Sequence, residues 1–381
     1  MKNKQKNVCF IGADPKVDGG ITNYQRNLIK YIESKEKAIN ITWVYKSQYT
    51  EKYSKDNINY VGLKVRNILF IDDFIFNKKV KTYLENNYFD IINSQAIWGY
   101  WMKNYKRKEN QILINTYHGV TFPYYKVHLR RFGIIKRILL SPLLLYSYLI
   151  EKPPIMKADK IICVSEKVKR QIEEIYGKRK DIFVIRTGVD LDNFKKRNTN
   201  LIRKELGLEK DKVYGLHVAK GGYWIKGLDR AVKLSEEIYK ENKNYRLIVI
   251  GPNYKKNRRF LNKEFIISLE KIPRERISLY YSASDIFFCL SRYEGGAPTL
   301  VTSEAMASGC LLVCSKDSEQ EIIENNKNGL IIEDFDKKDA EKIITVLNNK
   351  KNKDNIIKNS IKTIKELSLE KWGEEYTNLL K

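Results

Sequence analysis

Two glutamates and a glycine pair near residue 300 carry the clearest chemical signal in the sequence. Glu294 is followed by two glycines, and Glu304 comes ten positions after Glu294. The run 285–290 before them reads as a strand, and residues 302–308 read as a helix. A carboxylate accepts hydrogen bonds in a fork, which suits the vicinal hydroxyls of a sugar or ribose, and the first turn of a helix offers amides to a phosphate. The segment therefore predicts a site for such a ligand, although Glu304 alone is also compatible with a helix-stabilising role.

A second cluster of candidate binding residues surrounds a glycine turn in the middle of the chain. Lys220 and Lys226 flank Gly221 and Gly222, between the apolar run 213–218 and a helical segment. Glycine amides can approach the oxygens of a diphosphate while ammonium groups neutralise its charge. The pattern lacks the spacing of a P-loop. The turn predicts a diphosphate site, against the alternative that both lysines are simply solvated.

Two weaker candidates follow strands in the first half of the chain. Gly19 and Gly20 precede a helical segment, where a phosphate or sugar could approach the backbone. They do not form a G-x-G-x-x-G pattern, so a nicotinamide cofactor has no support. His118 ends the apolar run 112–117, the usual place of an active-site residue in an α/β fold. For both features a structural role is an equal alternative, and His217, inside a strand, is expected to be packed.

Short apolar runs alternate with longer segments of helical period along the chain. The strand candidates are residues 8–11, 41–45, 90–93, 112–117, 160–164 and 182–185 in the first half, and 213–218, 246–250, 285–290, 311–314 and 329–332 in the second. Apolar rather than alternating strands indicate parallel sheets covered by helices on both faces. Because the pattern occurs twice, around a polar linker at 192–200, we expect an α/β chain of two doubly wound, Rossmann-like domains facing a cleft.

The chain is strongly basic, with 71 Lys and Arg against 46 Asp and Glu and a formal net charge of +25. Such a field attracts nucleotide diphosphates, anionic lipids and nucleic acid alike. A nucleic-acid-binding protein without catalysis is therefore an alternative. The basic residues are dispersed and form no recognised nucleic-acid motif, so we expect no nucleic-acid partner.

Cysteine usage and the apolar runs bear on the cellular compartment. Five cysteines without C-x-x-C spacing indicate buried free thiols in a reducing compartment. No secretory signal precedes the first strand, and the longest apolar stretch, 138–150, is interrupted by Pro142 and too short to span a bilayer. No Cys/His cluster indicates a metal site, and Asp190 with Asp192 is expected to cap a turn. We therefore expect a cytoplasmic protein without a bound metal.

The segment 122–157 mixes basic residues with aromatic and aliphatic ones. Basic groups beside an apolar face suit docking on an anionic membrane surface, at the inner face of the cell membrane, and access to a lipid-linked acceptor. A buried helix with a solvated basic edge is the equal alternative.

Together these motifs resemble the retaining glycosyltransferases of the GT-B fold, in glycosyltransferase family four, and the similarity covers nearly the whole chain. Residues 161–166 resemble the family's strand–serine–helix element, and 186–194 resemble its interdomain signature. The resemblance implies an acceptor-side domain over 1–190, a nucleotide-sugar-binding domain over 191–364, and a final helix in 365–381 that crosses back to the first domain.

The resemblance also implies roles for the motif residues. Lys220 and Lys226 would neutralise the donor diphosphate, and Glu294 would bind the hydroxyls of the transferred sugar. His118 would face the sugar or the reacting centre, and Glu304 would hold the ribose diol. The remaining donor-binding residues would be Gly19, Gly20, Gly295, Gly296, Leu300, Val301 and Thr302.

The activity implied is that of a retaining, metal-independent hexosyltransferase. It would move a sugar from a UDP- or GDP-linked donor to a glycan or lipid-linked acceptor in the synthesis of a surface polysaccharide or glycolipid. No cofactor is implied beyond the nucleotide-sugar substrate. A GT-B sugar-nucleotide epimerase, which shares the fold and donor site, is the remaining alternative.

Three positions depart from the family's pattern. Lys220 stands where the family usually has arginine, which keeps the charge but loses the planar fork. Thr187 replaces the usual asparagine. The spacing of ten between Glu294 and Glu304, against the family's eight, predicts a longer loop around the donor sugar.

Overall fold

The computed structural model describes residues 5–68, 71–218, 222–251, 254–270, 272–296 and 298–380. The chain divides into two compact units, Met1–Arg186 with Trp372–Lys381, and Thr187–Lys371. The chain thus passes from the first unit to the second after Arg186, a few residues before the expected domain boundary at 190. It returns to the first unit within the final helix, before Trp372.

The first unit is built on a sheet with the strand order β3-β4-β2-β1-β5-β6-β7-β8 in its described residues. The strands are β1 (Lys6–Gly12), β2 (Ile39–Ser47), β3 (Glu51–Lys55), β4 (Ile58–Lys64), β5 (Ile91–Gln95), β6 (Ile112–Tyr117), β7 (Lys160–Cys163) and β8 (Ile182–Val184). Neighbouring strands are parallel except β3 and β4. The order reverses between β1 and β5, because β2 to β4 lie on one side of β1 and β5 to β8 lie on the other.

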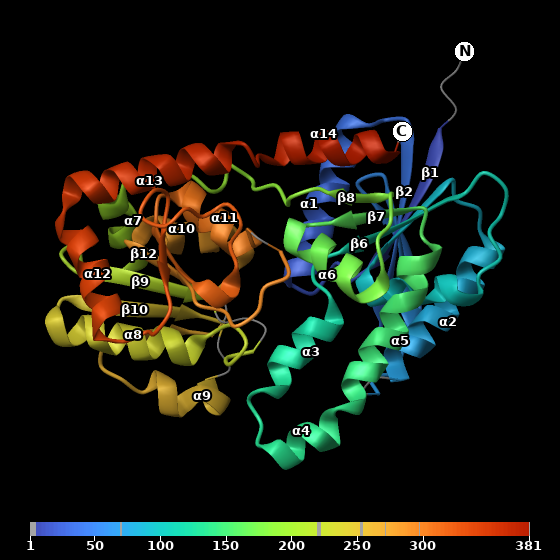
Figure 1. The fold of residues 1–381 in the computed structure, drawn as a ribbon. Helices are drawn as coiled ribbons and strands as arrows, with labels where there is room; N and C mark the ends of the chain where they lie inside the picture. The colour runs from blue at the N-terminus through green and yellow to red at the C-terminus, as the bar shows by residue number, and fades with distance from the viewer. Residues whose placement is uncertain are drawn as a thin grey trace. The chain divides into compact units, whose positions relative to one another are not determined.

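Helices connect these strands (Figure 1). They are α1 (Gly20–Lys35), α2 (Ile71–Asn86), the 3-10 helix η1 (Ala96–Asn104), α3 (Thr121–Leu129), α4 (Ile134–Leu140), α5 (Pro142–Lys157) and α6 (Glu166–Tyr176). Pro142 occupies the first turn of α5, where its missing amide costs no hydrogen bond. The apolar stretch 138–150 is therefore divided between two helices, as Pro142 predicted.

The second unit contains a sheet whose described strands are all parallel, in the order β11-β10-β9-β12-β13-β14. Its strands are β9 (Val213–Val218), β10 (Tyr245–Ile250), β11 (Ile266–Leu269), β12 (Ile286–Cys289), β13 (Leu311–Ser315) and β14 (Leu330–Ile332). Its helices are α7 (Thr199–Leu206), α8 (Leu228–Glu241), α9 (Tyr254–Leu261), α10 (Arg274–Ala283), α11 (Leu300–Ser308), the 3-10 helix η2 (Lys316–Ser318), α12 (Lys337–Asn348) and α13 (Lys350–Lys365). The last helix, α14 (Leu369–Leu380), passes from this unit into the first.

Alternate residues of the second sheet enter two separate hydrophobic cores. Leu247 and Val249 of β10 pack with α8 and α12, whereas Ile248 and Ile250 pack with α10, α11 and α13. A sheet buried on both faces needs apolar side chains at every position. This is why the strands read as continuous apolar runs, and it confirms the doubly wound α/β fold class of this unit.

The predicted strands are confirmed, and 112–117 and 213–218 match β6 and β9 at both ends. The strands β3, β4 and β11 were not predicted. β3 and β4 form an antiparallel hairpin through Asp56 and Asn57, whose φ values of 50° and 57° fit a type I′ turn. Most of β3 is exposed, so it lacks the apolar run that marks the other strands.

The end of α14 is anchored in the core of the first unit. Trp372, Tyr376 and Leu380 are buried there, and the Tyr376 hydroxyl lies 3.0 Å from Thr116 Oγ1. The five cysteines are free and buried, as predicted from their spacing. No helix among the described residues is both long and apolar enough to cross a membrane.

Candidate functional site

The candidates of the second unit lie where its strand order reverses. β9 and β12 are neighbours in the sheet, although β10 and β11 separate them in the chain. Lys226 follows β9 and Glu294 follows β12, so both lie beyond carboxyl ends of strands. Open α/β sheets bind their ligands at this kind of position. Lys220, the second predicted cation of the turn, lies outside the described residues.

Lys226 and Glu294 form an ion pair at this edge of the sheet. Lys226 Nζ lies 2.7 Å from Glu294 Oε1 and 2.9 Å from Oε2, and the Ser291 hydroxyl donates to Oε1 at 2.6 Å. The Glu294 side chain is 9% exposed and that of Lys226 is 31% exposed. Gly295 is buried and Gly296 is partly exposed. The carboxylate is therefore held in one orientation, with the ammonium group as its more accessible partner.

The turn that carries Lys226 is fixed against β12. Gly227 has a φ of +73°, and a Cβ at this position would lie 2.0 Å from the Leu290 carbonyl oxygen, so only glycine fits. The Arg292 guanidinium donates to both carboxylate oxygens of Asp229, at 2.8 and 2.6 Å. This bidentate pair joins the end of β12 to the start of α8 and preorganises the Lys226–Glu294 pair.

Helix α11 begins shortly after the glycine pair, and the residues of its first turn leave its N-terminus positive. Its first turn contains no acidic residue, so the partial positive charge of the helix end is not compensated there. The Thr299 hydroxyl accepts from the Thr302 amide at 3.2 Å and caps the helix. Leu300 and Val301 are partly exposed, whereas Thr302 is buried. Of the predicted amides, those of Leu300 and Val301 are therefore the ones best placed for a phosphate.

Glu304 is held by residues that the sequence did not point to. Its side chain is 1% exposed, and Oε1 accepts from Arg274 while Oε2 accepts from the Tyr281 hydroxyl at 3.1 Å. Burial raises the pKa of Glu304, and the Arg274 guanidinium acts in the opposite direction. Both oxygens have partners inside the unit, so a ribose diol can bind here only by sharing the carboxylate with Arg274 and Tyr281.

Gly19 is the N-cap of α1 and Gly20 its first residue, after β1 and next to the reversal of strand order in the first unit. Gly19 is extended, and a Cβ on it would meet only Thr22 Oγ1 at 3.7 Å, while one on Gly20 would meet nothing within 4 Å. Contacts inside the chain therefore do not require glycine here. Because α1 has no side-chain cap and no acid in its first turn, its N-terminus can approach a ligand.

His118 follows β6 and is tied to the neighbouring strand and to α14. Its Nε2 lies 2.7 Å from Gln95 Oε1, Gln95 Nε2 donates to Asn93 Oδ1 at 2.9 Å, and Asn93 Nδ2 donates to the Tyr376 hydroxyl at 2.5 Å. The Tyr24 ring and the imidazole pack edge to face, with ring centroids 4.4 Å apart. Burial lowers the pKa of His118 to about 3, so the ring is neutral at physiological pH. With Gln95 Oε1 as acceptor, Nε2 carries the proton and Nδ1 is left as an acceptor.

Two family models match the chain. The model described as Glycosyltransferase Family 4 matches residues 18–193, and the model described as Glycosyl transferases group 1 matches residues 198–363. The chain belongs to the family-four glycosyltransferases. The family that the motifs indicated is thereby confirmed, whereas the retention of configuration stays a prediction.

Relatives of this glycosyltransferase are distant in sequence. Spore coat protein SA of Bacillus subtilis is 23% identical over 371 residues, which cover 91% of this chain and 90% of that protein. An uncharacterized glycosyltransferase of Methanocaldococcus jannaschii is 28% identical over 221 residues, 56% of this chain and 57% of that protein.

Solved structures similar to this glycosyltransferase share its GT-B fold. Sucrose-phosphate synthase of Thermosynechococcus elongatus matches with a TM-score of 0.81 and 18% identity over 98% of both chains. WaaG, a glycosyltransferase involved in lipopolysaccharide biosynthesis, matches with a TM-score of 0.78 and 14% identity over 98% of this chain and 99% of its own. Anabaena HepE in complex with UDP-glucose matches with a TM-score of 0.72 and 14% identity over the same shares of the two chains. They confirm the predicted fold of two Rossmann-like domains.

The remaining residues that the sequence singled out in this glycosyltransferase have structural roles. His217 is 2% exposed within β9, and burial lowers its pKa to about 4, so its packing is confirmed. Asp190 Oδ1 accepts from the amides of Asp192 and Asn193 at 3.1 and 3.0 Å, which confirms that it caps a turn. Within the described ranges, no three His, Cys, Asp or Glu side chains converge as metal ligands.

Glu151 of α5 fixes the start of α3, three residues beyond His118. It is fully buried, and its Oε1 accepts from the Thr121 amide and hydroxyl at 2.8 and 2.7 Å, while Oε2 accepts from the Tyr176 hydroxyl at 3.1 Å. Burial raises the pKa of Glu151 to about 7. The folded protein therefore retains a proton on Glu151 between about pH 4.5 and 7 that the unfolded chain releases.

This titration predicts a pH-dependent effect of Glu151→Gln. An acid with a raised pKa in the folded state contributes stability at low pH, and that stability is lost as pH rises towards 7. The free energy of unfolding of the wild type should thus fall by about 2 kcal/mol between pH 5 and pH 8. The glutamine variant has no charge to titrate at this position and should not show this fall. We expect the melting temperature of the variant relative to wild type to increase from pH 5 to pH 8. A difference that does not change with pH would contradict the raised pKa.

Sequence reasoning missed Arg274, Tyr281 and Gln95. Arg274 and Tyr281 lie on α10, at sequence distances of 30 and 23 residues from Glu304, and no local pattern links them to it. Gln95 could have been found, because it is a polar residue at the carboxyl end of a predicted strand, as His118 is.

Proposed function

We propose that this glycosyltransferase transfers a sugar, with retention of configuration and without a bound metal, from a UDP- or GDP-linked donor to a glycan or lipid-linked acceptor. The observation that carries the proposal is the Lys226–Glu294 pair at the strand-order reversal of the second sheet. A cation and a carboxylate side by side suit the two parts of a nucleotide sugar, since the diphosphate is anionic and the sugar offers hydroxyls.

The leaving diphosphate gains negative charge as the glycosidic bond breaks. Lys226 and the N-terminus of α11 are fixed in place before the reaction, so they stabilise this charge without reorganisation. The family's retaining step proceeds through an oxocarbenium-like state in which the leaving phosphate helps to deprotonate the acceptor. The chain then needs no dedicated nucleophile, and Glu294 acts by holding the sugar hydroxyls.

The neutral His118 supplies a hydrogen bond rather than a charge. Its protonated Nε2 is engaged by Gln95, which leaves Nδ1 to accept a hydrogen bond from a hydroxyl of the sugar. Gly19 and Gly20, which nothing inside the chain requires, let the backbone of α1 approach the same ligand.

The role of Glu304 is proposed in modified form. Because Arg274 and Tyr281 already bind its two oxygens, we assign Glu304 to hold this pair in place as well as to accept a ribose hydroxyl. A carboxylate has about four lone-pair sites, so it can do both.

A nucleotide panel tests the donor class. HepE is similar in fold and was solved with UDP-glucose, which favours starting with uridine nucleotides. We expect UDP or GDP to raise the melting temperature and the matching nucleotide sugars to be slowly hydrolysed. A protein stabilised by oligonucleotides and by no nucleoside diphosphate would instead be a nucleic-acid-binding protein, and epimerisation of a nucleotide sugar would identify an epimerase.

Helix α4 supports the proposed membrane contact. It contains no buried residue, and its aliphatic side chains are largely exposed: Ile134, Ile135, Ile138 and Leu139 are 65–74% exposed. Basic residues lie on and beside it, including Arg131 and Lys136. A helix that exposes aliphatic groups among cations fits the interface of an anionic leaflet better than it fits water. The alternative of a buried helix is therefore wrong for α4, but it fits α5, which buries residues such as Ile150, Glu151 and Ile155.

Vesicle binding tests this contact. Wild type should sediment with phosphatidylglycerol vesicles at low salt, and the double variant Ile135→Asp/Leu139→Asp should bind at least tenfold more weakly, because each buried aliphatic side chain contributes about 1.5–3 kcal/mol. Leu201→Asp is the matched control, since Leu201 is 65% exposed in the second unit. A wild-type protein that ignores the vesicles would refute the proposed membrane contact.

A further inference from the structure

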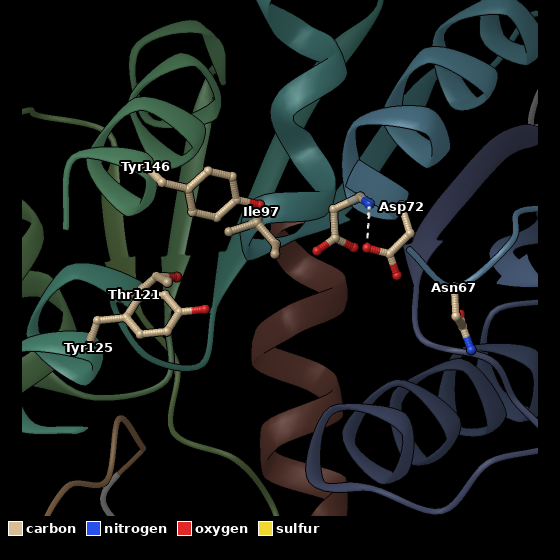
Figure 2. A pocket seen from close by; sticks show the side chains of 7 residues that line it. Asn67, Asp72, Ile97, Thr121, Tyr125 and Tyr146 are labelled. Carbon is tan, nitrogen blue, oxygen red and sulfur yellow. Dashed lines mark hydrogen bonds between the residues drawn. The ribbon is translucent and has the colours of Figure 1, made fainter. Parts of the chain in front are cut away.

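A cavity in the first unit is lined by residues that have no part in the proposed donor site. It measures about 470 Å³, and the residues around it include Asn67, Asp72, Asp73, Ile97, Tyr125 and Tyr146 (Figure 2). Its volume falls within the roughly 300–1,000 Å³ that is typical of small-molecule sites.

The cavity lies at the carboxyl ends of parallel strands. Asn67 follows β4, Ile97 follows β5, and Thr121, which also lines the cavity, follows β6. The ends of β5 and β6 also hold Gln95 and His118, which hydrogen-bond to one another. The cavity is therefore built on the same strand ends as His118.

The charge of the lining is negative. The ammonium group of Lys46 lies 2.8 Å from Asp72 Oδ2 and 3.2 Å from Asp73 Oδ1, so one cation serves two carboxylates. In a chain with a net charge of +25, this is a local reversal of sign. It disfavours a phosphate or carboxylate at this place by like-charge repulsion.

Two phenol rings complete the lining. Figure 2 shows Tyr125 and Tyr146 on one side of the cavity and Asp72 on the other, with Ile97 between them. Burial raises the pKa of both tyrosines, and the negative charge of Asp73 raises that of Tyr146 further. Their hydroxyls therefore remain protonated and can donate hydrogen bonds. Carboxylate acceptors, phenol donors and ring faces together match a sugar, whose hydroxyls both donate and accept and whose CH groups pack on rings.

We propose that this cavity binds the acceptor sugar and takes an uncharged sugar or an amino sugar. This inference rests on the proposed function as a transferase. Helix α5 carries Tyr146 in the cavity, and its neighbours Leu145 and Leu149 are 61% and 54% exposed. A lipid attached to the acceptor can therefore leave the cavity along an exposed apolar surface.

Saturation-transfer NMR on the full chain tests the site. The probes are the methyl glycosides of glucose, galactose, mannose and glucosamine, and methyl glucoside 6-phosphate as the anionic counterpart. We expect signals from at least one uncharged or amino glycoside and none from the phosphate. Ile97→Trp, which places a bulky indole between the two tyrosines and Asp72, should abolish the signals, and Tyr125→Phe/Tyr146→Phe should weaken binding at least tenfold. Tyr88→Phe, which removes an exposed hydroxyl of the same unit, is the control.

The outcomes separate this inference from the proposed function. Binding of UDP or GDP, followed by melting temperature, reports on the donor site of the second unit and shows that each variant is folded. Glycoside signals that persist in folded Ile97→Trp, equal signals from the phosphorylated probe, or no signal from any probe would each overturn the cavity assignment. A protein that binds glycosides in the cavity but neither hydrolyses nor transfers from any nucleotide sugar would overturn the proposed function instead.

Discussion

Replacing Glu294 by alanine should reduce kcat/KM for sugar transfer by about a thousandfold, which is ~4 kcal/mol of transition-state stabilisation. The variant loses the acceptor for the sugar hydroxyls and also the two hydrogen bonds, at 2.7 and 2.9 Å, that Lys226 donates to this carboxylate. The fold should survive, because the Lys226 side chain is 31% exposed, so water can hydrate its ammonium group in place of the Glu294 carboxylate. Transfer from the donor identified by the nucleotide panel is the measurement.

A matched control exists in the same unit. Lys263 and Glu236 also form an ion pair at 2.7 Å, but Glu236 is 43% exposed, so Glu236→Ala removes a comparable contact away from the strand-order reversal. This variant should transfer at the wild-type rate. Near-normal turnover of well-folded Glu294→Ala would remove the basis of the assignment.

Lys226 and Glu294 should also behave as one unit in kinetics. Lys226→Met and Glu294→Gln each break the same pair, so the double variant should lose little more activity than the worse single variant. Fully additive losses would mean that the two side chains act on the substrate independently.

The sequence predicted those parts of the site that are local in the chain. A buried parallel strand reads as an apolar run, so its carboxyl end can be located to within a residue or two, and Glu294, Lys226 and His118 follow such ends. Their partners were harder to predict. Ser291 precedes Glu294 in the same motif, but Arg274 reaches Glu304 from another helix, and packing alone brings them together.

The remaining features depended on tertiary structure in other ways. The β3–β4 hairpin is exposed, so its side chains carry no apolar pattern. The cavity takes Asp72 from α2 and Tyr146 from α5, which are far apart in the chain, and neither residue belongs to a motif. The division of the chain at Arg186 follows contacts rather than composition, because Val189, before the predicted linker, and Phe194, inside it, are buried in the core of the second unit.

Arg274→Ala should destabilise the second unit by about 3 kcal/mol, because removing one partner of a buried ion pair leaves an unpaired charge. Glu304 is 1% exposed, and of its hydrogen-bond partners among the described residues only the Tyr281 hydroxyl would remain. Loss of the guanidinium also removes the influence that lowers the Glu304 pKa, while the burial that raises it persists. Since stability from a raised carboxyl pKa is lost as pH rises, the cost of the substitution should be larger at pH 8 than at pH 5.

Charge neutralisation should rescue this variant. Arg274→Ala/Glu304→Gln no longer buries an unpaired carboxylate and should melt at a higher temperature than Arg274→Ala alone, with most of the gain at pH 8. Arg276→Ala, two residues along the same helix, is the control, because its contact with Glu205 is 3.6 Å long and exposed on both sides and should contribute close to nothing.

If Glu304 holds Arg274 as well as the ribose, Arg274→Ala and Glu304→Gln should both weaken binding of the donor nucleotide, measured by its effect on the melting temperature. An Arg274→Ala protein with unchanged nucleotide affinity would leave Glu304 as a direct ribose ligand and Arg274 as a structural residue only.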